Sequence, residues 1–207
     1  MSTEVVRGRA YGHGPRRLVR RTNERHQWEK NRARAGREER GATGATEHDT
    51  GLTVDDLVFH AEYHDVRADE ELARALRVRV GTRLVERLYR TRYREEAAPL
   101  NMTRSYLVHA MVASNPDLLD AAREPWPGGT QSQLCTVGVE VDRVEERVTA
   151  RPPTAEEARE LALPPGTAVM VLRKACVDTD GRVVDWSEVI LPGDRTEAVF
   201  TTRLERW

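Results

Sequence analysis

The stretch "DEELARALRVRVGTRLVERLYRTRYREEAAPLNMTRSYLV" (Asp69–Val108) has a second version later in the chain, "AEEARELALPPGTAVMVLRKACVDTDGRVVDWSEVIL" (Ala155–Leu191). Each version contains an acidic helix start, a short leucine- and alanine-rich segment, a Gly-Thr pair, and two apolar runs joined by a turn. Aligning Gly81 with Gly166 gives an offset of 85 residues. Two long copies do not make a solenoid, which needs three or more shorter repeats. The duplication therefore predicts two half-domains that close one shared core, with a site at the seam between them.

Each copy has the sequence signals of a helix followed by a strand hairpin. The acids at 69–71 suit a helix start, where the helix dipole favours negative charge. Thr154 and Glu157 have the spacing of a capping box, and "DTDG" (Asp178–Gly181) between two apolar runs is typical of a hairpin turn. Strands are expected at 54–66, 84–93, 100–108, 139–150, 167–177, 183–191 and 198–207. This pattern predicts an α+β body, an antiparallel sheet with helices on one side.

The first fifty residues differ in composition from the rest. Residues 1–40 hold twelve basic and five acidic side chains, whereas the whole chain has a net charge of −1. The segment has few large apolar side chains to offset an ordering entropy of about 1–2 kcal/mol per residue. We therefore expect a basic arm or linker over 1–50 and a folded domain over 51–207. A basic arm on an acidic body either meets an anionic partner such as nucleic acid or rests on its own body.

Several classes of protein are disfavoured by what the sequence lacks. No apolar stretch approaches the ~20 residues that cross a bilayer, and the first residues do not resemble a secretory signal, so we expect a cytoplasmic protein without a membrane partner. His60 and His64 fall in a strand pattern, about 13 Å apart at about 3.3 Å per residue, which does not suit a metal site. Phosphate-loop and nucleophile motifs are also missing. We expect no catalytic residues, metal or cofactor.

The candidate site residues are polar side chains at strand positions that face the apolar side. Arg90 and Arg92 alternate in phase with Leu84 and Leu88. A guanidinium beside an apolar row is costly unless it is paired. The partner is either an internal acid or a ligand carboxylate or phosphate, which arginine binds with a fork of donors. Asp185 either accepts from ligand hydroxyls or neutralises an arginine, and both interpretations stay open.

Four segments together resemble the UTRA domain, the effector-binding part of the HutC branch of GntR-type bacterial transcription factors. They are "RTRYREEAAPLNMTRSYL" (Arg90–Leu107), "GGTQSQL" (Gly128–Leu134), "VTARPPTAEEARELALPPGTAVMVLRKACVDTDGRVVDW" (Val148–Trp186) and "LPGDR" (Leu191–Arg195). The resemblance covers about residues 52–207. It implies a chorismate lyase-like fold, an antiparallel sheet with pseudo-twofold halves.

The resemblance also implies a set of effector-binding positions. Carried over by position, they are Arg90, Arg92, Thr103, Thr130, Ser132 and Asp185. The chain departs from the family at two places. Thr103 stands where many relatives have glutamate, and Leu191 stands where an aromatic residue is often found. The expected effector is a small anionic metabolite that binds between the two sheet halves of the domain and acts on DNA binding through a homodimer.

The front of the chain departs further from the family pattern. Relatives carry a winged helix-turn-helix here, whereas "YGHGPRRLV" (Tyr11–Val19) resembles only the end of a wing, and "RRTNERHQWEKNRAR" (Arg20–Arg34) resembles the linker that follows. Four side chains are expected to make weak contacts to the DNA backbone: Arg16, Arg17, Arg20 and Arg21. Without a recognition helix the chain should not read base edges, so an operator is a partner only if a winged helix lies upstream.

Three functional hypotheses follow. The first is a GntR/HutC-type regulator, or its effector-sensing part, that is not an enzyme. The second is a lyase-type enzyme on the same fold, for which fold similarity is a weak argument. The third is a dimerisation module without an effector, or a nucleic-acid binder acting through its basic arm.

Overall fold

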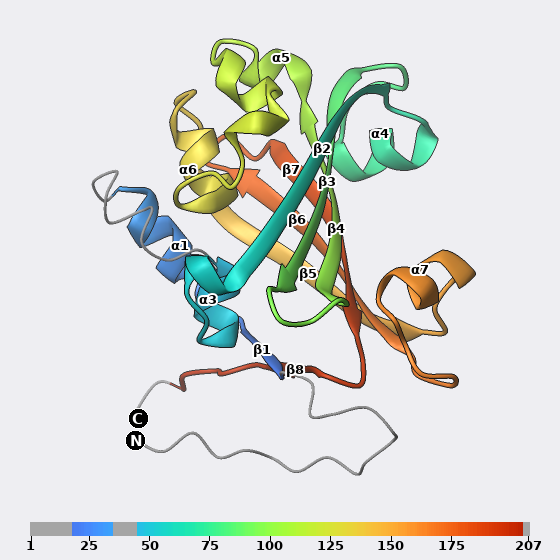
Figure 1. Ribbon diagram of the computed structural model, residues 1–207. Helices are drawn as coiled ribbons and strands as arrows, with labels where there is room; N and C mark the ends of the chain where they lie inside the picture. Colours follow the sequence, from blue (N-terminus) through green and yellow to red (C-terminus); the bar gives the residue numbers. More distant parts are fainter. Residues whose placement is uncertain (1–17, 35–44, 205–207) are drawn as a thin grey trace.

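A computed structural model describes residues 18–34 and 45–204 (Figure 1). Its centre is a six-stranded antiparallel sheet in the order β2-β3-β4-β7-β6-β5. The strands are β2 (Leu57–Arg67), β3 (Arg83–Tyr93), β4 (Pro99–Val108), β5 (Val141–Arg151), β6 (Val169–Asp178) and β7 (Val183–Pro192). The antiparallel α+β sheet expected from the sequence is confirmed.

The helices are short and lie around this sheet. The α-helices are α1 (Arg25–Ala33), α3 (Ala45–Thr50), α4 (Glu70–Leu76), α5 (His109–Val112), α6 (Gly129–Cys135) and α7 (Ala155–Glu160). Single turns of 3₁₀-helix are η1 (Val54–Asp56), η2 (Pro116–Leu119) and η3 (Ala121–Arg123). A two-stranded parallel ribbon is made by β1 (Val19–Thr22) and β8 (Thr196–Val199).

The duplicated sequence corresponds to a duplicated unit of strand, helix and hairpin. The first unit is β2-α4-β3-β4 and the second is β5-α7-β6-β7. Corresponding elements begin 84 to 86 residues apart, in agreement with the offset of 85 in the sequence. The two units meet where β4 pairs with β7 at the centre of the sheet. The structure therefore contains the two repeated halves expected from the sequence, and the seam between them runs through the middle of the sheet.

Helices cover both faces of the sheet, which differs from the single covered side expected from the sequence. Leu84 packs with α4, while its neighbour Val85 packs with the cluster that includes Val112 of α5 and Leu134 of α6. Adjacent residues of a strand point to opposite faces, so α4 and α6 lie on opposite sides (Figure 1). We call the side under α5 and α6 the α6 face and the side under α4 and α7 the α4 face.

The local turn and cap signals explain where the elements begin. Asp69 accepts a hydrogen bond from the backbone N–H of Leu72 at 2.8 Å and so caps α4. Thr154 and Glu157 form the capping box at the start of α7. Asp178 accepts from the N–H of Arg182 at 2.8 Å within the β6–β7 turn. These three signals were read correctly from the sequence. Several strand ends lie two to three residues from their expected positions, and the last strand, expected at 198–207, is instead β8 (Thr196–Val199), with residues 200–204 outside any strand.

The described part of the first fifty residues packs on the domain. β1 pairs with β8, and Val19 is buried with Leu52, Leu57 and Leu100. Helix α1 lies against α6. Ordering of this segment is therefore tied to the main body, which supplies the apolar surface that the segment lacks. Within 18–34 and 45–204, no helix is long and apolar enough to span a membrane.

Candidate functional site

A buried polar cluster occupies the centre of the α6 face. Arg87 of β3 donates from its guanidinium to Ser105 of β4 at 2.6 Å and to Asp185 of β7 at 2.9 Å. Ser105 also donates to the Asp185 carboxylate at 2.6 Å. All three side chains are almost completely buried. The cluster therefore joins the two halves of the domain across their seam.

The strand register explains why these residues meet. Arg87 lies opposite Ser105, and Ser105 lies opposite Ser187, so one line of pairs crosses β3, β4 and β7. Asp185 is two residues before Ser187 and therefore points to the same face. A polar line of this kind in the middle of a sheet is costly unless every charge is paired. Arg87 and Asp185 meet that requirement with each other.

Helix α6 adds a second layer of hydrogen bonds above the cluster. Gln133 accepts from Arg87 at 2.7 Å and donates to Glu124 at 2.7 Å. Glu124 also accepts from the hydroxyls of Tyr63 at 2.5 Å and Tyr89 at 3.0 Å. This loop glutamate is thereby fixed over β2 and β3, and the site consists of a sheet layer and a loop-and-helix layer.

Burial and neighbouring groups shift the pKa values of several side chains in and beside the cluster. Burial would lower the pKa of Arg87, but Tyr89 and Asp185 hold it above its ordinary value, so it stays a cation. Burial raises the pKa of Tyr63 to about 12. Burial likewise raises the pKa of the Cys176 thiol to about 12, which keeps that thiol protonated and unreactive at neutral pH. The arrangement suits binding by preset donors and acceptors more than nucleophilic chemistry.

Ser132 of α6 is a polar group that the structure leaves without a partner. Its side chain is completely buried, and its hydroxyl has no hydrogen-bond partner. A buried hydroxyl of this kind costs about 1–3 kcal/mol, and such groups call for an explanation. A ligand that hydrogen-bonds Ser132 would remove this cost.

Four of the residues expected from the sequence belong to the same face or to its helical cover. Asp185 lies in the cluster, and Ser132 lies beside Gln133 in α6. Thr130 is the second residue of α6 and is partly buried. Thr103 is on β4 opposite Tyr89, and its hydroxyl donates to Asn101 at 3.3 Å. Thr103 and Asp185 are on the two strands that meet at the seam, and Thr130 and Ser132 are in the helix that covers this face.

Arg90 and Arg92 lie elsewhere, on the α4 face. Arg90 is within 3.3 Å of both Glu62 and Glu160. Arg92 donates to backbone carbonyls at the β3–β4 turn, among them that of Arg94 at 3.1 Å. The sequence expectation that they line a crevice with Asp185 does not match this placement, because they point to the face opposite Asp185. For Arg90, the structure agrees with the other interpretation, in which the arginine pairs with acids of its own domain.

The four arginines expected near DNA are placed differently from one another. Arg16 and Arg17 lie outside the described residues. Arg20 is exposed and pairs with Glu197 at 2.9 Å. Arg21 is largely buried, 3.5 Å from Glu146, and burial, followed by the nearby Arg25, lowers its pKa to about 10. Arg21 is therefore directed into the domain.

Arg87 is the main site residue that the sequence reasoning missed. The signal was present, because Arg87 alternates in phase with Val85 and Tyr89, on the side of β3 opposite Arg90. Glu124 and Gln133 carry no comparable signal, since their roles depend on how a loop and a short helix fold over the sheet. Register across three strands, not a local motif, brings this site together.

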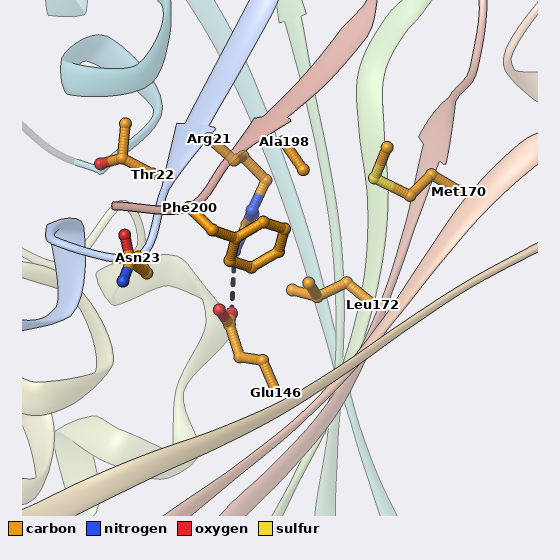
Figure 2. A pocket seen from close by; sticks show the side chains of 8 residues that line it. All are labelled: Arg21, Thr22, Asn23, Glu146, Met170, Leu172, Ala198 and Phe200. Atoms are coloured by element: carbon orange, nitrogen blue, oxygen red, sulfur yellow. Dashed lines mark hydrogen bonds and ion pairs between the residues drawn. The ribbon is translucent and has the colours of Figure 1, made fainter. Parts of the chain in front are cut away.

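A small crevice lies between the β1–β8 ribbon and the sheet (Figure 2). Met170, Leu172 and Phe200 supply apolar walls, and the pair of Arg21 and Glu146 crosses it. In 18–34 and 45–204, no group of three or more histidine, cysteine, aspartate or glutamate residues is placed to hold a metal ion.

Comparison with known proteins agrees with this architecture. The chain belongs to the UTRA domain family, whose model matches residues 60–197. It is similar to a GntR-family transcriptional regulator of known structure, with a TM-score of 0.67 and 25% identity over 80% of this chain and 66% of that one. The effector domain of PhnF from Mycobacterium smegmatis matches with a TM-score of 0.58 and 19% identity over 72% of this chain and 90% of that one.

The curated relative is matched over a shorter region. An uncharacterised HTH-type transcriptional regulator of Streptomyces coelicolor is 38% identical over 68 residues. That match spans 33% of this chain and 25% of the Streptomyces protein. The fold is the chorismate lyase-like fold of GntR effector domains, as the sequence resemblance implied.

Proposed function

We propose that the chain is the effector-sensing part of a GntR-type transcriptional regulator, and that its ligand binds on the α6 face at the seam of the two halves. The observation that carries this proposal is the buried cluster of Arg87, Ser105 and Asp185, with the unpartnered hydroxyl of Ser132 in the helix above it. Membership of the UTRA family supports it. Polar groups of this kind, held under a short helix, suit a small hydrophilic metabolite.

The proposed ligand is anionic, and Arg87 is its cationic partner. Asp185 now occupies part of the guanidinium fork of Arg87. A ligand carboxylate or phosphate would take over those donors, since arginine binds such groups in a bidentate manner. Asp185 would keep a cation within reach, because Lys174 lies 3.9 Å from its other oxygen. The exchange leaves no charge without a partner, which a buried site requires.

The finer features of a GntR regulator are part of the same proposal. The ligand would alter the geometry of a homodimer, and operator binding would depend on a winged helix supplied in the same polypeptide. A coupling of about 1–3 kcal/mol between ligand and operator is typical of such switches. Charge-assisted hydrogen bonds of about 1.5–3 kcal/mol each are large enough to supply it.

A melting screen tests the proposal. The chain is heated with a library of carboxylated and phosphorylated metabolites, and we expect at least one to raise the melting temperature. Ser132→Ala should lose most of that ligand-induced rise without a loss of intrinsic stability, because its hydroxyl makes no bond in the free protein. Arg90→Gln, on the opposite face, is the matched control and should keep the rise. A rise that survives Ser132→Ala but vanishes in Arg90→Gln would place the site on the α4 face.

A further inference from the structure

The N-terminal helix α1 lies over the same side of the sheet as the polar cluster. Gln131 of α6 donates to the backbone carbonyl of His26 in α1 at 3.0 Å and to the carboxylate of Glu29 at 3.4 Å. Lys30 of α1 donates to the carbonyl of Val141 in β5 at 2.7 Å. Helix α1 is thus attached to both the helical cover of the site and the edge of the sheet.

Ion pairs make up much of this attachment. Arg25 of α1 pairs with Glu29 at 3.1 Å and with Asp49 of α3. His26 lies 3.0 Å from Glu146 of β5. Because these groups are largely buried, the strength of each ion pair depends on the charges around it more than on bulk solvent.

Lys174 stands between this network and the cluster. On β6 it is the direct cross-strand partner of Glu146, and neighbours in that relation have Cβ atoms about 4.5–5.5 Å apart. On its other side its ammonium lies 3.9 Å from the Asp185 carboxylate. The charges agree with this position. Burial alone would raise the pKa of Glu29, but Arg25 holds it below the ordinary value. His26 does the same for Glu146. Lys174 contributes to the lowering of both pKa values.

We propose that Lys174 is a counter-ion shared by the Arg87–Asp185 cluster and the acidic groups that hold α1, so that a change of charge at the cluster alters how tightly α1 is bound. A fixed cation can neutralise one set of carboxylates only at the expense of the other. When Asp185 leaves Arg87 it turns to Lys174, and the hold of Lys174 on Glu146 and Glu29 weakens. The inference rests on the proposed function, for which it supplies a route from ligand to N-terminal segment.

The charge coupling can be tested without any ligand by amide hydrogen exchange of residues 19–34 in the full chain. Lys174→Met keeps most of the side-chain stem and removes the charge, and exchange in α1 should become at least fivefold faster. Asp185→Asn frees Lys174 for Glu146 and Glu29, and exchange in α1 should become at least threefold slower. The opposite signs are decisive, because general loosening of the fold would speed exchange in both variants.

Two further variants complete the test. Arg173→Met is the matched control, since Arg173 is the neighbour of Lys174 but pairs with Glu188 on the α4 face; it should leave α1 exchange unchanged. If Asp185→Asn does not fold, Lys174→Arg replaces it: the charge is kept, so α1 exchange should stay near that of the wild type, whereas general loosening at this position would speed it as in Lys174→Met. Unchanged α1 exchange in Lys174→Met, or faster exchange in Asp185→Asn, overturns the inference.

The same samples separate this inference from the proposed function. Melting with inorganic phosphate and with malonate reports whether anions bind, whatever α1 does. Ligand-free exchange that follows the predicted signs, without any anion-induced stabilisation, would leave the charge coupling standing and contradict the anionic ligand. If an anion stabilises the chain but α1 exchange does not follow the predicted signs, the ligand site is supported and Lys174 is not its link to α1.

Discussion

Single buried side chains hold distant parts of this fold together, and Arg195 is the clearest case outside the polar cluster. It comes from the "LPGDR" segment and is 2% exposed. Its guanidinium donates to the carbonyl of Pro99 at 3.2 Å and to that of Leu161 at 2.8 Å. These carbonyls belong to different halves of the domain. Arg195 therefore links the start of β4 to the end of α7.

Arg195→Met should destabilise the domain by about 3–5 kcal/mol, because it removes a buried charge-assisted pair of hydrogen bonds and leaves two carbonyls unpaired. Urea unfolding followed by circular dichroism measures the loss. Arg147→Met, at an exposed position on β5, is the control and should change stability by no more than about 0.5 kcal/mol. Equal stability of the two variants would contradict the role given to Arg195.

At position 193 the neighbouring backbone leaves no room for a side chain, so glycine is required. A Cβ atom there would lie 2.5 Å from the carbonyl oxygen of Ala168, which accepts the Gly193 N–H at 3.0 Å. Gly193→Ala should therefore cost about 1–3 kcal/mol through overpacking. Gly181→Ala meets no atom within 4 Å and carries only the strain of a positive φ, so it should cost less. Thermal unfolding of both variants checks the order, and a larger loss for Gly181→Ala would refute the steric reason.

At the scale of elements, α1 is held by groups that titrate. Burial alone would lower the pKa of His26, but Glu146 and Glu29 raise it above the ordinary value. A raised pKa means that the protonated form binds these acids in the folded state. Its stabilising contribution is complete below the ordinary histidine pKa, about 6.5, and is lost as pH rises through the raised value. The groups around His26 also include Arg21, Arg25 and Lys174.

We therefore expect the attachment of α1 to weaken as pH rises above about 6.5. Amide exchange of residues 25–33, corrected for the intrinsic pH dependence, should show falling protection in the wild type between pH 6 and 9. His26→Gln should remove this dependence, while His60→Gln, at an exposed position on β2, should retain it. A wild-type profile as flat as that of His26→Gln would show that His26 carries no such contribution.

The elements themselves were largely predictable from the sequence, and the reason is local. Caps such as Thr154 with Glu157, and turns such as Asp178–Gly181, act through hydrogen bonds within a few residues. The faces of the strands were harder. β3 carries arginines in both phases, and local alternation does not tell which phase faces α6. Arg90 satisfied the apolar-phase criterion, yet Arg87 is the one that meets Asp185.

At the scale of the whole molecule, the duplication indicated two halves and a seam, but not the second layer over it. The core shows why the halves depend on each other. The hydrophobic core on the α6 face combines Val85 and Leu107 of the first half with Cys176 and Val184 of the second. On the α4 face, Leu84 packs with Val177 of the other half. Neither unit closes its own apolar surface.

An isolated half should therefore fail to fold cooperatively. Residues 51–138, expressed alone, would expose the β4 edge that pairs with β7 and the apolar side chains that the second half covers, so we expect a broad, non-cooperative urea transition and binding of a hydrophobic dye. Mixing this fragment with residues 139–207 should restore a cooperative transition and quench the dye signal, since the missing surface is supplied in trans. The intact chain is the reference for both signals. A sharp transition for the first half alone would mean that each repeat carries a sufficient core, and the site at the seam would then join two independent domains.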